Sequence, residues 1–169
     1  MIVFLYGPDT SNRLQKQKAI IAQYQAKHSH LTVDRFDLEE DGEIVRLKDF
    51  LSGLSLFGAF KLAVVAGCYQ AEAVGLYQNF LDEKEVALLL ISAERPTADF
   101  LFLLKKPVWC QHFSPLSGTR WTNFIKKESL SRGLRLQPAE IDALSLQYQN
   151  DSWGLINELE QCRLLGGRT

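Results

Sequence analysis

Short apolar runs alternate with amphipathic segments along the first two thirds of the chain. The run at 2–6 is rich in β-branched and aromatic residues and ends in Gly7-Pro8-Asp9, as is typical of a buried strand followed by a turn. This alternation predicts an α/β fold in which helices cover both faces of a mostly parallel sheet. Strands are expected at 2–6, 31–36, 61–66, 86–92 and 108–113. A first helix is expected to be capped by Thr10 or Ser11 and to end at the polar break that begins at Lys27. Further helices are expected at 44–53, 72–81 and 98–105.

The patterning becomes purely helical after the Pro- and Gly-containing segment 114–118, which predicts a linker and a domain boundary. We expect an α/β domain over 1–116 and a small three-helix domain over 117–169. The first helix of that domain is marked by Trp121, Phe124 and Ile125. The second is opened by Pro138 and marked by Ile141, Leu144 and Leu146, and the third is marked by Trp153, Ile156 and Leu159.

Net charge, hydropathy and cysteine content indicate which kinds of partner and which compartment to expect. The formal net charge is −1, which does not favour a dedicated nucleic-acid binder, because phosphate contacts need clustered Lys and Arg. The longest apolar run, at 86–91, is far shorter than a membrane helix, and Met1 is not followed by a basic leader or a cleavage site. We therefore expect a cytoplasmic protein without membrane contact. Its three separated cysteines are expected to be reduced, mostly buried thiols.

The turn after the first strand is where a phosphate-binding loop would lie in such a fold. That loop needs a second glycine, then Lys, then Ser or Thr. Gly7 matches, but Asn12 and Arg13 occupy the positions of the second glycine and the lysine, and Asp9 adds a negative charge. We interpret the segment as a degenerate phosphate loop that forms a structural turn and holds no nucleotide cofactor.

Other candidate chemistry is weaker. The acidic stretch 37–43 is expected to be a solvated turn that places Glu43 at a helix N-terminus. No third metal ligand accompanies the His28/His30 pair or the Cys110/His112 pair, and no Gly-x-Ser-x-Gly turn is present, so neither a metal site nor a nucleophile is predicted. Lys126 and Lys127 are possible DNA contacts, although the neighbouring Glu128 favours a solvated face.

One apolar segment is harder to assign to a core. Leu54, Leu56 and Phe57 follow a helix that already has its own apolar face, and Gly53 and Gly58 bracket them. Large side chains in such a turn either pack inward or contact a partner. The pattern alone leaves both possibilities open.

The segment 50–58, running into 61–65, resembles the Ser-Leu-Phe-Gly element and following strand of the delta subunit of the bacterial DNA polymerase III clamp loader. Gly7 and Asp9 after the first strand are also similar to that family. Further similarities are the junction at 113–116, Trp121 with Ile125, and the segments 134–136, 150–151 and 157–160. The resemblance spans nearly the whole chain.

The resemblance implies a RecA-like α/β domain and a helical lid of the ATPase-inactive AAA+ type, without intrinsic catalysis. In this family the Leu-Phe pair enters a pocket on the beta sliding clamp, and the subunit opens the ring during DNA replication. It implies Leu56 and Phe57 as anchors, Ser55 as the residue that shapes the turn, and Leu54 and Ser52 as peripheral contacts. Ser52 stands where many clamp-binding motifs have Gln.

The implied partners are the beta clamp, the other clamp-loader subunits, and primer-template DNA within the assembly. The family continues into a C-terminal collar domain, which we expect to be absent here because the chain stops at Thr169. Two alternatives remain: a nucleotide-dependent ATPase with a degenerate phosphate loop, and a DNA-contacting module that uses the basic lid helix.

Overall fold

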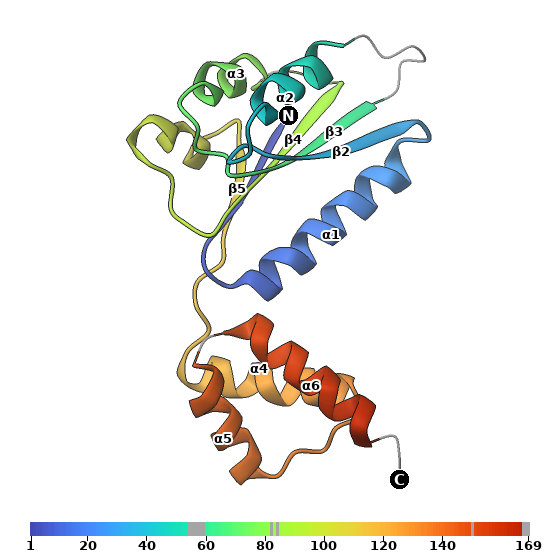
Figure 1. The fold of residues 1–169 in the computed structure, drawn as a ribbon, viewed down its shortest axis with the longest axis vertical. Coiled ribbons are helices and arrows are strands. Elements are labelled where there is room, and N and C mark those ends of the chain that lie inside the picture. Colours follow the sequence, from blue (N-terminus) through green and yellow to red (C-terminus); the bar gives the residue numbers. More distant parts are fainter. Residues whose placement is uncertain (54–59, 82, 84, 150, 167–169) are drawn as a thin grey trace. The chain divides into compact units, whose positions relative to one another are not determined.

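The computed structural model describes residues 1–53, 60–81, 83, 85–149 and 151–166, and divides the chain into two compact units. The sheet unit contains residues 1–7 and 13–113, and the helical unit contains residues 8–12 and 114–169 (Figure 1). Within the described residues, no helix has the length and apolarity needed to cross a membrane.

Five parallel strands form the sheet, in the order β2-β3-β4-β1-β5. Residue 2 of β1 lies opposite residue 88 of β4, and residue 31 of β2 lies opposite residue 60 of β3. This arrangement confirms the predicted α/β class. The strands are β1 (Ile2–Tyr6), β2 (Leu31–Asp37), β3 (Phe60–Ala66), β4 (Val86–Ser92) and β5 (Trp109–His112).

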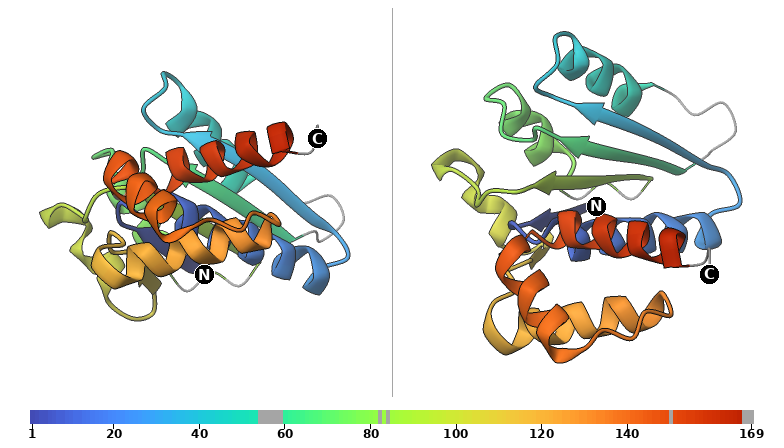
Figure 2. Two further views of the ribbon diagram at one scale, coloured as in Figure 1. Left: turned by 90° about the horizontal axis from the view of Figure 1, so that it is seen from below. Right: turned by 60° about the horizontal axis from the view of Figure 1, so that its bottom comes forward.

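The central strands β1 and β4 are buried on both faces, which explains why they appear in the sequence as apolar runs. The edge strands β2 and β5 contain polar residues and are more exposed. In β4, Leu88 and Leu90 face one core cluster, whereas Leu89 faces the other. Helix α1 (Thr10–Lys27) packs on the Leu89 face through Ile20. The opposite face is covered by α2 (Glu43–Ser52), α3 (Ala73–Asn79) and the 3-10 helix η1 (Ala98–Leu104) (Figure 2).

The helical unit has a core of its own, in which Trp121, Ile125 and Leu159 are almost fully buried. Its helices are α4 (Gly118–Ser131), α5 (Pro138–Tyr148) and α6 (Ser152–Gly166). The predicted opening of the second helix at Pro138 is confirmed. The backbone N–H of Gln137, the residue before α5, donates to the Glu140 carboxylate over 2.6 Å. This bond is part of a capping box that stabilises the start of the helix.

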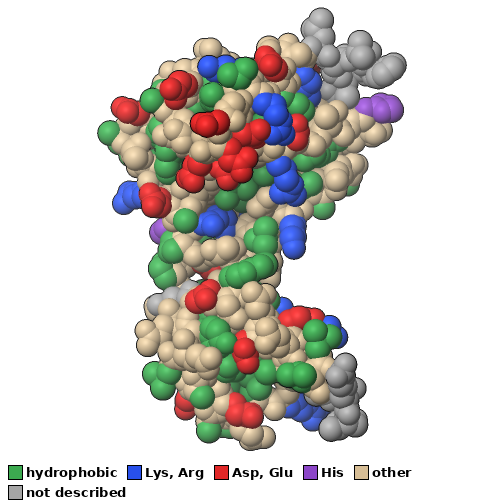
Figure 3. Space-filling model, in the orientation of Figure 1, with side chains coloured by type: hydrophobic (Ala, Val, Ile, Leu, Met, Phe, Trp, Pro, Cys, Tyr) green, Lys and Arg blue, Asp and Glu red, His purple; other side chains and the backbone are tan. Residues whose placement is uncertain are grey.

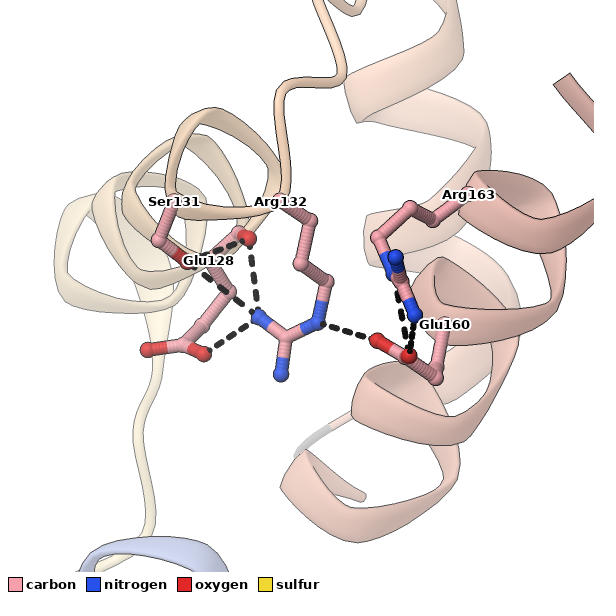
Figure 4. Close-up of polar contacts among 5 residues, drawn as sticks. All are labelled: Glu128, Ser131, Arg132, Glu160 and Arg163. Carbon is pink, nitrogen blue, oxygen red and sulfur yellow. Dashed lines mark hydrogen bonds and ion pairs between the residues drawn. The ribbon is translucent and has the colours of Figure 1, made fainter. Parts of the chain in front are cut away.

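Arg132 joins two helices of this unit (Figure 4). Its guanidinium donates to the Glu128 carboxylate at 2.7 Å and to the Glu128 carbonyl at 2.8 Å, and its Nε lies 3.4 Å from a Glu160 carboxylate oxygen. Arg163 donates to the other oxygen of Glu160 at 2.5 Å. The network therefore links the C-terminal end of α4 to α6.

The helix predicted at 98–105 is present as a 3-10 helix over 98–104. Phe100 and Leu103 are both buried, and a period of three residues places them on the same side. Two predicted markers of the helical unit were wrong. Leu146 is 72% exposed, because it lies five positions after the buried Ile141 and so projects from another face of α5. Trp153 is 47% exposed. In this helix the buried residue is Leu155, and residues two positions apart lie on nearly opposite sides of an α-helix.

The cysteines also differ from the expectation of mostly buried thiols. All three are free, but only Cys68 is buried, whereas Cys110 is half-buried and Cys162 is exposed.

Candidate functional site

The turn after β1 requires glycine for reasons of backbone packing. Gly7 has a φ of +120°, and a Cβ at this position would overlap the backbone of Phe113. Its N–H donates to the Ser92 carbonyl over 3.1 Å. Gly7 is thus explained by the close approach of the chain after β5, whether or not a phosphate ever binds here.

The first turn of α1 is filled by the protein's own polar groups. The Asp9 carboxylate accepts from the Asn12 backbone N–H at 3.3 Å and from the Asn12 side-chain amide at 2.6 Å. Asp9 is therefore the residue that caps the helix, and the predicted cap at Thr10 or Ser11 was wrong. The Ser152 hydroxyl donates to Asp9 at 3.0 Å and accepts from the Ser11 N–H at 3.3 Å.

These contacts occupy the groups that a phosphate would use. Asp9, Ser11 and Ser152 are each about 3% exposed. The N-terminus of a helix attracts anions through its free N–H groups and its partial positive charge. Here a carboxylate and a hydroxyl from the same chain already accept those N–H groups, so an incoming phosphate would have to displace both.

Arg13 stands at the position of the phosphate-loop lysine but is directed at the backbone. Its guanidinium donates to the Gly7 carbonyl and, at 2.9 Å, to the Ser92 carbonyl. It thereby ties the end of β1 to the end of β4. A lysine in a working loop has its ammonium free for the terminal phosphates.

A thiol lies near this edge of the sheet, at Cys68, just after β3. Burial raises its pKa to about 12. At neutral pH the side chain is a protonated thiol, and the thiolate is the form that acts as a nucleophile. Cys68 is therefore suited to packing rather than to covalent catalysis.

The predicted clamp anchors Leu56 and Phe57, together with Leu54 and Ser55, lie outside the described residues. Ser52 is described: it is the last residue of α2, is exposed, and donates through its hydroxyl to the Lys48 carbonyl over 2.8 Å.

Both flanks of this segment are fixed by Lys61, a residue that the sequence analysis did not select. Its ammonium donates to the carbonyls of Phe50, at 2.6 Å, and of Gly53. The same ammonium lies 5.4 Å from the centre of the Phe50 ring. Residues 50 and 53 precede the segment and residue 61 follows it, so one side chain holds the two ends together. The only sequence signal was a lysine in an otherwise apolar strand.

Phe60 provides a second anchor at the start of β3. Its N–H donates to the His30 carbonyl over 2.9 Å, and its ring stacks on His28 with centroids 4.0 Å apart. The backbone on the C-terminal side of the segment is therefore fixed to the sheet and to the end of α1.

The remaining candidates are not brought into a shared site. Lys126 and Lys127 are exposed on α4, beside the buried Glu128. In the acidic stretch, Glu43 lies in the first turn of α2 as predicted and pairs with Arg46 at 2.5 Å. Among the residues that the structure describes, no group of three or more His, Cys, Asp or Glu side chains could hold a metal ion.

No protein-family model matches the chain, and no curated protein matches it in sequence. Among solved structures, the chain is similar to the Bacillus subtilis DNA clamp loader delta protein (YqeN), with a TM-score of 0.54 and 16% sequence identity. The alignment covers 99% of this chain and 54% of that chain, so this chain spans about half the length of its structural neighbour. The chain therefore has the fold of the corresponding part of a clamp loader delta protein.

Proposed function

We propose that this chain is a non-catalytic, delta-like subunit that binds the beta sliding clamp and opens it during DNA replication. The observation that carries the proposal is the anchored segment between α2 and β3: Lys61 holds its two ends, and its sequence contains the Leu-Phe pair. The fold shared with a clamp loader delta protein supports the same assignment.

In this proposal Leu56 and Phe57 enter a pocket on the clamp, Ser55 shapes the turn, and Leu54 and Ser52 contact the rim. Burying one Leu and one Phe yields about 3 to 6 kcal/mol. Micromolar affinity requires roughly 8 kcal/mol after the entropic cost of association has been met. The exposed side of α2, which ends at Ser52, is well placed to add the missing contact area.

The absence of ATPase activity is part of the proposal. The Asp9 carboxylate and the Ser152 hydroxyl accept the N–H groups that would bind phosphate, and Arg13 is bonded to backbone carbonyls. The degenerate loop of Gly7, Asp9, Asn12 and Arg13 would then be a structural turn, and the chain would depend on other loader subunits for nucleotide hydrolysis. Within such an assembly, Lys126 and Lys127 are candidates for contact with primer-template DNA.

Clamp binding by surface plasmon resonance tests the proposal. Leu56→Ala and Phe57→Ala should each weaken affinity by about 2 kcal/mol or more if these residues are central anchors. Leu146→Ala is a matched control, because it removes an exposed leucine from the helical unit. Unchanged affinity in both anchor variants would overturn the assignment. Strongly salt-dependent DNA binding without clamp would instead favour the DNA-contacting alternative.

A further inference from the structure

Two adjoining cavities form a groove at the carboxyl ends of β2, β3 and β4. Their volumes are about 400 and 420 Å³, and they adjoin at Asp37, Ala66 and Ile91, which line both. We call this space the carboxyl-edge groove. In open parallel sheets, ligands bind outside the carboxyl ends of the strands. The groove lies wholly within the sheet unit, and its lining includes neither Ser52 nor Lys61.

The groove carries excess negative charge. Asp37, Glu39, Glu40 and Glu94 line it, and none of them has a cation within ion-pair distance in the described part of the chain. Three arginines also line the groove: Arg13 donates to backbone carbonyls, Arg46 pairs with Glu43 and Asp34, and the exposed Arg35 makes no ion pair with the described residues. Five carboxylates, including the paired Glu43, therefore face three guanidinium groups. Figure 3 shows acidic side chains gathered on this unit.

Gln17 provides an independent indication of a ligand. It is only 7% exposed, it lines the groove from α1, and its amide makes no hydrogen bond with any residue that the structure describes. Its amide atoms are not among the fully enclosed unpaired atoms, so they are open to the groove. The amide oxygen of Gln17 is thus an available acceptor beside unpaired carboxylates, which together suit a ligand with several N–H donors.

We propose that the carboxyl-edge groove binds an arginine side chain of a protein partner. A guanidinium has five N–H donors in a planar array, which matches separated carboxylate and amide oxygens. Tyr69 also lines the groove, and an aromatic ring beside the site is compatible with a bound cation. A metal ion would need converging ligands, and the described residues contain no such group.

The test uses the full chain labelled with nitrogen-15 and titrated with N-acetyl-arginine amide, followed by NMR. We expect saturable shifts of the amides at 66–69, with a dissociation constant of about 1 to 10 mM for this small probe. N-acetyl-citrulline amide has nearly the same shape without the charge and should shift the same signals little.

Variants locate the site. Gln17→Leu and Glu40→Gln should each weaken binding of the arginine probe about threefold or more. Asp41→Asn removes one nearby charge outside the groove lining and should have little effect. The proposal is overturned if the citrulline probe binds equally well, if no shift saturates, or if Mg²⁺ binds these residues more tightly than the arginine probe does. Clamp binding plays no part in these readouts, so failure of the clamp proposal would leave this test intact.

Discussion

The Ser152 hydroxyl donates a hydrogen bond to the Asp9 carboxylate over 3.0 Å, although the two residues are 143 positions apart. The bond is buried, and the same hydroxyl accepts from the Ser11 N–H. One serine at the start of α6 therefore completes the first turn of α1. The start of α1 is thus held by a contact within the helical unit.

Ser152→Ala should lower the free energy of unfolding by about 1 to 3 kcal/mol, because it leaves a buried carboxylate and a buried N–H each short of a partner. Urea denaturation followed by circular dichroism measures the change. Ser52→Ala is the control, since the Ser52 hydroxyl is exposed and bonds only the Lys48 carbonyl. Equal stability of the Ser152 variant and the wild type would show that this bond does not hold the turn.

The wild-type chain should show no saturable binding of ATP and no turnover, because the helix N-terminus already has its own acceptors. Asp9→Gly alone should not restore binding, since Arg13 remains bonded to the Gly7 and Ser92 carbonyls. Fluorescence titration with a labelled ATP and a phosphate-release assay measure both properties. Clear saturable hydrolysis by the wild type would favour the ATPase alternative.

The sequence was sufficient to predict the strands. The central strands of a parallel sheet covered on both faces appear as continuous apolar runs, as in β1 and β4, whereas the edge strands β2 and β5 also contain polar residues. Residues 86–90 of β4, for example, are all buried. What periodicity could not predict was local geometry, as with the 3-10 helix at 98–104, whose seven residues are too few to distinguish a period of 3.0 from one of 3.6.

The site was less predictable than the fold, because its decisive contacts join distant parts of the chain. Asp9 could be identified as a departure from the phosphate loop, but not as the partner of Ser152. Lys61 could be identified as a charged residue in an apolar strand. Its bonds to the carbonyls of Phe50 and Gly53 could not be predicted, because they depend on how close the C-terminal end of α2 lies to β3. Neither contact leaves a signal in spacing or composition.

Stability of the helical unit should depend on acid pH through Glu160. Its hydrogen bond with Arg163 is the main cause that lowers the pKa of Glu160 from its ordinary value of 4.5. A carboxylate whose pKa is lower in the folded state stabilises the fold at and above the unfolded value, and this contribution is lost as pH falls through the folded value. The effect is therefore expected below about pH 4.5.

Glu160→Gln should flatten the fall of the melting temperature between about pH 5 and pH 3, because it removes the titrating group. Thermal unfolding followed by circular dichroism over this range measures the slope. Asp142→Asn is the control, since Asp142 is exposed on α5 and has no resolved ion pair in the described residues. The role of the network would be contradicted if the melting temperature of the Glu160 variant fell with pH as steeply as that of the wild type, or if the control flattened this dependence equally.

Lys61→Met should weaken clamp binding without changing any residue proposed to touch the clamp. The ammonium is bonded to the carbonyls of Phe50 and Gly53, so its removal frees the ends of the segment that carries the anchors. A binding element that is fixed before it meets its partner loses less conformational entropy on association. We expect a loss of about 1 to 2 kcal/mol, which corresponds to roughly 5- to 30-fold in the dissociation constant.

Lys18→Met is the matched control, because Lys18 is an exposed lysine of α1, outside the surface proposed to contact the clamp. Surface plasmon resonance with immobilised clamp compares the two variants, and urea denaturation shows how much of each loss is due to global stability. If both variants bind alike while both remain folded, the contact of Lys61 with the two carbonyls is structural only. If Lys61→Met alone loses affinity, mainly through slower association, the anchoring of the segment before contact is what the clamp requires.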